Sequence, residues 1–193
     1  MSVAPWRSQI ERALEEHREI TYARYFQLAT ITPENRPANR TVVFRGFDVE
    51  RDRLKVVTDL RSDKVCHIAH QPWAEACWYF PQTWEQFRLS GILSLVKADD
   101  ADITLQQARQ ASWQALSDAA RLQFACSSEP GKPKIEDAIA PLQPDPIEPL
   151  PNFCLLLLEP MQVDYLLLRG EPQNRWLYDR GDNHQWFVQE INP

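Results

Sequence analysis

The chain has 193 residues, of which 44% are hydrophobic and 25% charged, and its formal net charge is −6. These values are typical of a globular protein that buries a core without help from disulfides or metal ions. They argue against a broad nucleic-acid surface, which needs an excess of cations, but they are compatible with a local basic pocket.

The first half of the chain predicts a helix followed by a series of strands. Helical spacing of apolar residues and Pro5 in the first turn indicate a helix over residues 5–19. A second, short helix is expected to begin at Ser62, a suitable N-cap, and to stop before Pro72. Alternating patterns between turn residues predict the strands 26–32, 39–47, 52–59, 75–82 and 85–96.

The second half predicts one or two helices over 98–127 and then a change of character. Residues 129–151 are rich in proline, so this segment is expected to wrap the surface as a loop. The apolar stretch 153–170 predicts two strands broken at Glu159-Pro160, and residues 174–180 and 185–193 predict a terminal hairpin. Because most connections are short, we expect antiparallel neighbours in a barrel or sandwich of six or seven strands.

The cysteines and histidines give little indication of a metal site or of disulfide bonds. The chain has four cysteines, none in a Cys-x-x-Cys spacing: Cys66, Cys77, Cys126 and Cys154. His67 and His70 lie three positions apart on a predicted helix, but no third ligand accompanies them, so no metal site is expected. The first residues lack the apolar segment of an export signal, and no run of about 18 apolar residues is present. We therefore expect reduced cysteines, a cytoplasmic protein and no membrane partner.

A phosphate-binding site would have to use side chains. The chain contains only five glycines and no glycine-rich phosphate-binding motif. The turn after residue 57 offers the hydroxyls and cations of Thr58, Arg61, Ser62 and Lys64 near a predicted helix N-terminus, which suits a phosphate. The alternative is simple N-capping by Ser62 with solvated Arg and Lys side chains.

Two further cations, Arg40 and Arg45, lie in the predicted strand 39–47. Their odd offset would point them to opposite faces of a regular strand. We therefore expect them to serve two different parts of a ligand or two surfaces.

Four segments together resemble those of one known family. They are "RTVVFRGFD" (40–48), "VVTDLRSDKVCHIAHQPWAEACWYFP" (56–81), "WEQFRLSG" (84–91) and "DYLLLRGEPQNRWLYDR" (164–180). Each is weak alone, but in this order they resemble the pyridoxamine 5′-phosphate oxidase-like family of FMN-binding split barrels. The resemblance implies an α+β, mainly β fold over residues 1–193, a six-stranded antiparallel split β-barrel of Greek-key type with flanking helices. It also implies a homodimer with FMN at the interface, a small-molecule substrate and FMN-dependent oxidoreductase activity.

The resemblance assigns roles to individual residues. Arg40 is implied to reach the FMN phosphate or ring edge, Ser62 and Lys64 to hold the phosphate, and Gln86 of the second subunit to contact the polar edge of the ring. The remaining implied flavin contacts are Thr41, Val42, Val43, Thr58, Tyr165 and Arg175. Cations and hydroxyls suit the phosphate, and an apolar slot suits the flat ring.

The departures from the oxidase concern its substrate site. Where the oxidase places a Tyr, an Arg and a Ser, the best register here gives Trp113, Ser117 and Arg121. Its Arg-x-His pair becomes Glu171 and Gln173, and an acid would repel a phosphorylated substrate.

Two other departures are milder. The family's Ser-Arg-Lys turn reads Ser-Asp-Lys, so Arg61 or Arg40 could supply the missing phosphate contact. A Lys of the oxidase is Arg45 here, and Arg45 and Trp113 are the residues expected to contact substrate. Three readings stay open: an FMN oxidoreductase with a different substrate, a true pyridoxamine 5′-phosphate oxidase with a rewired site, and a flavin carrier or sensor without turnover. No catalytic residue is predicted.

Overall fold

The computed structural model describes residues 3–48, 51–127, 130–132 and 141–193. Within these ranges a short 3₁₀ helix (Thr21–Arg24) precedes the first strand. The helices are α1 (Arg7–Glu16), α2 (Asp63–His70), α3 (Ile103–Gln114) and α4 (Asp118–Ala125). The strands are β1 (Tyr25–Ile31), β2 (Pro37–Val43), β3 (Leu54–Asp59), β4 (Trp73–Phe80), β5 (Glu85–Val96), β6 (Phe153–Leu167), β7 (Asn174–Arg180) and β8 (Trp186–Ile191).

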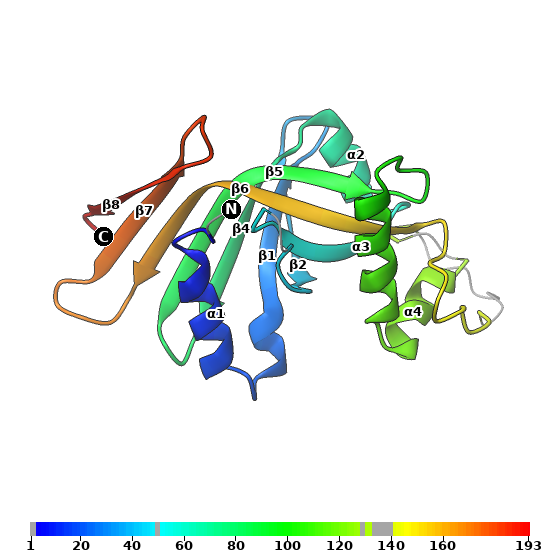
Figure 1. Cartoon of the computed structure of the whole chain (residues 1–193), viewed down its shortest axis with the longest axis horizontal. Coiled ribbons are helices and arrows are strands. Elements are labelled where there is room, and N and C mark those ends of the chain that lie inside the picture. The colour runs from blue at the N-terminus through cyan, green and yellow to red at the C-terminus, as the bar shows by residue number, and fades with distance from the viewer. Residues whose placement is uncertain (1–2, 49–50, 128–129, 133–140) are drawn as a thin grey trace.

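The strands form one antiparallel sheet with helices at its sides (Figure 1). Its order is β2-β1-β4-β5-β6-β7-β8, and β3 pairs with the first part of β6. This mainly β architecture confirms the predicted fold class. The described sheet has eight strands instead of six or seven, and the predicted terminal hairpin forms its last two, β7 and β8.

Strand β6 runs without a break for 15 residues, so the predicted interruption at Glu159-Pro160 is wrong. Proline cannot donate to a neighbouring strand, but a register shift in the β5–β6 ladder between Ser90 and Gly91 accommodates it there. Gly91 makes this possible: a Cβ at that position would lie 2.0 Å from the carbonyl oxygen of Glu159. The long strand can therefore pair with β5 along both of its halves, with β3 at its start and with β7 at its end.

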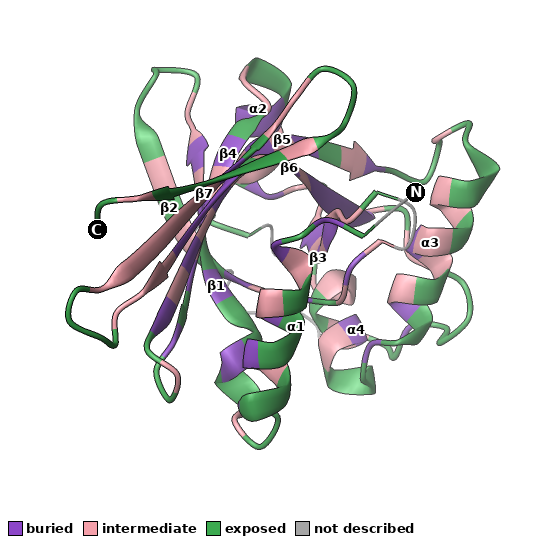
Figure 2. Ribbon diagram, turned by 60° about the vertical axis from the view of Figure 1, so that its left-hand side comes forward, coloured by how far each residue is buried: buried purple, intermediate pink, exposed green. Residues whose placement is uncertain are grey.

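The main core lies between the sheet and α1, which both carry buried positions on the ribbon (Figure 2). It is rich in aromatic rings: Phe26, Trp78, Phe80 and Phe87 are fully buried, as the alternation of the strands predicts, and so is Trp6 at the start of α1. No helix in the described ranges is long and apolar enough to cross a membrane.

The predicted helical segment 98–127 forms two helices, not one. Asp102 caps α3 by accepting from the amides of Thr104 and Leu105, and Ser117 caps α4 by accepting from the amide of Ala120. A second small core, built on Trp113, Leu116 and Phe153, attaches both helices to the start of β6.

The proline-rich loop predicted over 129–151 lies partly outside the described residues. Its described parts, 130–132 and 141–151, contain neither helix nor strand. The later part packs on α3, where Trp113 Nε1 donates to the carbonyl of Asp145 at 2.9 Å and Arg109 donates to that of Leu150 at 2.7 Å. The loop thus fastens α3 from outside.

Candidate cofactor site

A cavity of about 320 Å³ lies where the ends of β2 and β3 and the start of α2 face α4; we call it the basic cavity. Its strand side is lined by Arg40, Thr41, Val42, Val43, Arg45, Val57, Thr58, Asp59, Ser62 and Lys64. Its opposite side is lined by Leu116, Ala120, Gln123, Phe124 and Pro130. The structure therefore brings together seven of the ten residues predicted to contact the flavin, and Arg45 with them.

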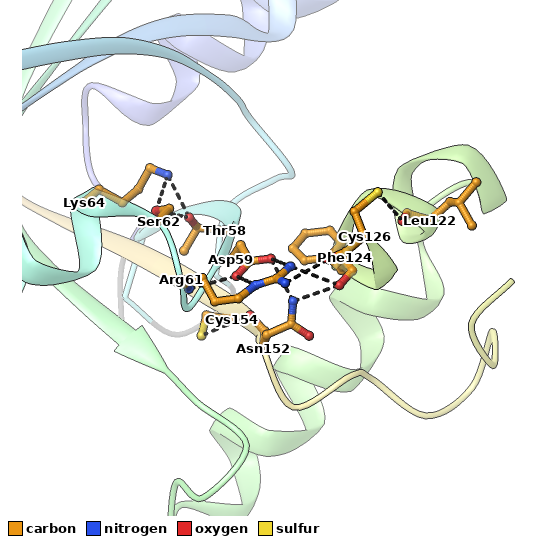
Figure 3. A network of polar contacts seen from close by, with 10 residues as sticks. All are labelled: Thr58, Asp59, Arg61, Ser62, Lys64, Leu122, Phe124, Cys126, Asn152 and Cys154. Carbon is orange, nitrogen blue, oxygen red and sulfur yellow. Dashed lines mark hydrogen bonds and ion pairs between the residues drawn. The ribbon is translucent and has the colours of Figure 1, made fainter. Parts of the chain in front are cut away.

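Lys64 is held over the turn between β3 and α2 by two hydroxyls. Its ammonium donates to Thr58 Oγ1 at 2.9 Å and to Ser62 Oγ at 2.7 Å (Figure 3). Burial and the nearby Arg40 lower the pKa of Lys64. Among the described residues, no carboxylate forms an ion pair with this ammonium, so its charge is available to a ligand.

Ser62 stands at the N-cap position of α2, but its side chain accepts no hydrogen bond from the helix amides. Its oxygen instead accepts from Lys64 and lies 3.4 Å from Thr58 Oγ1. The reading in which Ser62 merely caps the helix with its hydroxyl is therefore wrong. The hydroxyl belongs to a small polar cluster at the wall of the basic cavity.

Arg40 is the second cation of this wall. Its Nη1 donates to the carbonyl of Leu28 at 3.0 Å and to Thr30 Oγ1 at 2.6 Å. Burial lowers the pKa of Arg40, and within the described ranges no carboxylate lies in ion-pair contact with it. Two neighbouring cations, Arg40 and Lys64, are thus oriented by neutral groups and not by carboxylates of the described residues, an arrangement that favours an anion between or beside them.

Arg45 lines the same cavity as Arg40, which fits the expectation that the two cations serve two parts of one ligand. The alternation ends because β2 ends at Val43. Beyond it the amide of Arg45 donates to the carbonyl of Lys55 at 2.8 Å, and Gly46 takes φ +107°. Arg45 itself is exposed at the cavity's edge.

Arg61 is not among the residues that line the basic cavity, and its side chain points toward Asp59 and the end of α4 (Figure 3). Its guanidinium donates to both carboxylate oxygens of Asp59, at 2.9 and 2.7 Å, and to the carbonyls of Cys126 and Phe124. Asn152 completes the network by donating to Asp59 at 2.7 Å and to the carbonyl of Phe124 at 2.9 Å. Of the two candidates to replace the missing phosphate contact, only Arg40 therefore lines the cavity. The role of α4 as a cavity wall was missed, because it depends on contacts between residues far apart in the sequence.

The other three predicted flavin residues lie on a different part of the sheet. Gln86 and Arg175 both pair with Leu166, from β5 and β7, so they share one face of the sheet. Arg175 donates to Asp164 at 2.9 and 2.7 Å. Tyr165 belongs to the opposite face.

Tyr165 is buried between the rings of Phe87 and Trp176, with centroid distances of 4.6 and 5.1 Å. Its hydroxyl donates to the buried carboxylate of Glu85, which also pairs with Arg12. Burial and this hydrogen bond raise the pKa of Tyr165. In its own chain this phenol is part of the core.

The structure does not bring Trp113 to the basic cavity, because its side chain is fully buried in the small core beneath α3 and α4. Arg121 is also turned inward: it donates to the carbonyl of Leu116 at 2.6 Å and pairs with Asp118. Glu171 and Gln173 border a separate hollow with Trp84.

The two clustered histidines point to different partners. His67 contacts Thr30 at 2.9 Å, and His70 contacts the side-chain oxygen of Asn35 at 3.1 Å. Across the described ranges no group of three or more metal-ligating side chains is present.

Comparison with known proteins places these features in one family. Residues 3–97 match the family described as "Pyridoxamine 5'-phosphate oxidase, FMN-binding domain". An Arabidopsis thaliana protein, "Pyridoxine/pyridoxamine 5'-phosphate oxidase 2", is 45% identical over 99% of this chain and 98% of its own.

Solved structures agree. A pyridoxamine 5′-phosphate oxidase-related, FMN-binding protein from Nostoc punctiforme has 59% identity, a TM-score of 0.95 and full coverage of both chains. PhzG from Burkholderia lata, at 18% identity, covers 100% of this chain and 98% of its own with a TM-score of 0.74, which shows the shared fold. The chain therefore belongs to the pyridoxamine 5′-phosphate oxidase-like family.

Proposed function

We propose that the protein binds FMN in the basic cavity and is an FMN-dependent oxidoreductase. One observation carries the proposal: Arg40 and Lys64 stand side by side with no described carboxylate partner, next to the hydroxyls of Thr58 and Ser62. A phosphate that accepts from two cations and two hydroxyls would neutralise this otherwise costly arrangement.

The rest of the cavity suits a flat, largely apolar ring. Val43 and Val57 line the strand side, and Leu116 and Phe124 line the side formed by the helices. Together with Thr41 and Val42 they would exclude water from one part of the flavin. Bound FMN would supply two-electron redox chemistry, while the chain supplies binding and orientation.

We infer that the site is completed by a second copy of the chain. Gln86 and Arg175 share one face of the sheet, away from the residues that line the cavity of the same chain. In a two-fold homodimer, this face of one subunit could approach the basic cavity of the other and offer an amide and a guanidinium to the polar edge of the ring. Arg175 is already oriented for such a contact by Asp164.

For the substrate, we favour a small molecule other than pyridoxamine 5′-phosphate. On α3 and α4, Arg109 and Arg121 are buried and donate to backbone carbonyls, so neither offers its charge to a substrate phosphate. The 45% identity to the Arabidopsis protein named as a pyridoxine/pyridoxamine 5′-phosphate oxidase supports the alternative, a true oxidase with a rewired phosphate site. In that case exposed Arg45 is the cation available at the cavity's edge.

The test is a visible spectrum of the purified protein, followed by anaerobic titration of the FMN-loaded protein. Failure of added FMN to change its spectrum or fluorescence would sink the proposal. Rapid bleaching by pyridoxamine 5′-phosphate would establish the oxidase alternative, whereas bleaching only by another reductant, such as NADPH or a small amine, supports a different substrate. Binding without bleaching by any of them supports a flavin carrier or sensor.

A further inference from the structure

A buried polar chain links Arg40 to helix α2. Thr30, on β1, is 1% exposed and His67, on α2, is 8% exposed. Arg40 Nη1 lies 2.6 Å from Thr30 Oγ1, which lies 2.9 Å from His67 Nδ1. Arg40 Nη2 lies 3.5 Å from the same imidazole nitrogen. The side chains of Arg40, Thr30 and His67, a cation, a hydroxyl and an imidazole, therefore form a continuous hydrogen-bonded path.

The direction of each hydrogen bond in this path follows from proton counting. A guanidinium can only donate, so the Thr30 oxygen accepts from Arg40. A hydroxyl oxygen can accept two hydrogen bonds, so Thr30 alone does not fix the role of His67 Nδ1. Arg40 Nη2 also faces Nδ1 and can only donate, so we assign Nδ1 as an acceptor, the Thr30 hydroxyl as a donor to it, and the imidazole as neutral with its proton on Nε2.

The charges around His67 agree with a neutral ring. Burial and then Arg40 lower its pKa, with a further contribution from Lys64, while Asp63 and Glu34 act in the opposite direction. A second proton on Nδ1 would face the guanidinium of Arg40 and would leave the Thr30 hydroxyl without its acceptor.

We propose that His67, acting through Thr30, is a positioning residue that holds the Arg40 guanidinium in place for the flavin. The inference rests on the proposed function. Arginine is long and loses rotamer freedom when it is fixed, so pre-orientation before the ligand arrives strengthens binding. A carboxylate would also orient Arg40, but it would cancel the charge that the ligand needs. Neutral acceptors, namely the carbonyl of Leu28, Thr30 and His67, fix the side chain and leave its charge intact.

The experiment is a fluorescence titration of FMN into the apoprotein of the wild type and of single variants at pH 7.5. His67→Leu and Thr30→Val each break the path, and we expect them to weaken FMN binding about 3- to 10-fold, the effect of losing one hydrogen bond. His67→Asn keeps an acceptor near the position of Nδ1 and should bind FMN within about 2-fold of the wild type. His70→Leu is the matched control on the exposed side of α2, and it should not change the affinity.

A pH series separates positioning from simple packing. The FMN phosphate titrates near pH 6 in every variant, so the ratio of wild-type to His67→Asn affinity isolates the imidazole. Protonation of His67 would remove the acceptor from the path, and because its pKa is lowered from 6.5 the effect should show at the acid end of the series. As the pH falls from 7.5 to 4.5, the wild type should therefore lose affinity more steeply than His67→Asn. An equal loss in both, or a wild-type affinity that rises relative to His67→Asn because an imidazolium attracts the phosphate, would overturn the inference.

Failure of the proposed FMN binding can be distinguished from failure of the positioning role of His67. A wild type that does not bind FMN at any of these pH values refutes the proposed function itself. Normal wild-type binding together with unchanged affinity in both His67→Leu and Thr30→Val refutes only the positioning role. Should His67→Leu fail to fold, as judged by circular dichroism, Thr30→Val and the pH series of His67→Asn still decide the question.

Discussion

Replacing Lys64 with methionine should weaken FMN binding without destabilising the apoprotein. Methionine keeps a flexible apolar side chain of similar length but removes the ammonium that Thr58 and Ser62 orient. A charged hydrogen bond contributes about 1.5–3 kcal/mol, so the dissociation constant should rise about 10- to 150-fold. The variant leaves no carboxylate unpaired in the described structure, because Lys64 forms no ion pair there.

The sign of the stability effect follows from the pKa. Burial and Arg40 lower the pKa of Lys64 below its ordinary value of 10.5, so the folded apoprotein holds this proton less tightly than the unfolded chain. The charged ammonium therefore reduces the stability of the apoprotein at neutral pH. Stability should be regained as the pH rises through the lowered pKa towards 10.5. Lys64→Met lacks this cost at every pH, so its free energy of unfolding at neutral pH should equal or exceed that of the wild type.

The two effects require two assays, namely FMN fluorescence titration and denaturant unfolding of the apoprotein at pH 7.5 and pH 10. Lys97→Met is the matched control, since Lys97 is exposed and does not line the basic cavity. A Lys64→Met protein that binds FMN as tightly as the wild type would refute the phosphate assignment. A variant that loses stability as well as affinity would show that Lys64 is a structural residue.

Three further predictions concern the scaffold. Gly91→Ala should lower the free energy of unfolding by about 1–3 kcal/mol, as measured by urea denaturation, because its Cβ would lie 2.0 Å from a carbonyl oxygen of β6. Asp164→Asn should lower the free energy of unfolding by about 1–3 kcal/mol at pH 7. Burial opposes ionisation of this carboxyl, but hydrogen bonds from Arg175 and Arg88 hold its pKa below 3.8. The difference from the wild type should persist above pH 4 and disappear as the pH falls through that lowered pKa. Iodoacetamide at pH 7.5, followed by mass spectrometry, should label exposed Cys66 in the native protein but spare Cys154 until it unfolds, since burial raises the pKa of that buried thiol to about 11.

Local patterns in the sequence predict most of the elements of this fold. Alternation places the inward rings of β4 and β5, and the segment 98–127 is helical as predicted. The error at Pro160 has a clear cause: proline normally ends inner strands, and its accommodation depends on Gly91 of the neighbouring strand. Which strand lies beside Pro160 is not a local property of the chain.

The site was predictable where neighbouring residues build it and unpredictable where distant residues do. The turn containing Thr58, Ser62 and Lys64 could be recognised because its hydroxyls and its cation lie within one short segment. The contact of Arg61 with the end of α4 could not be, because the carbonyls of Phe124 and Cys126 that it reaches lie more than 60 positions away. The spacing of Arg40 and Arg45 left two parts of one ligand and two separate surfaces equally open, since the choice depends on where β2 ends.

The pairing of β3 with β6 has a consequence for the order in which the protein is made. Leu54 pairs with Leu158 and Asp59 with Phe153, so apart from a local bridge between Phe47 and Leu54 the strand that presents Thr58 lacks its ladder partner until residues 153–158 have been made. Loop closure over such a distance is slow compared with hairpin formation, as in the local pair β1–β2. A nascent chain would therefore form its β1–β2 hairpin early but would complete its phosphate-binding turn only after β6 has been made. Capture of the cofactor should then follow the synthesis of β6.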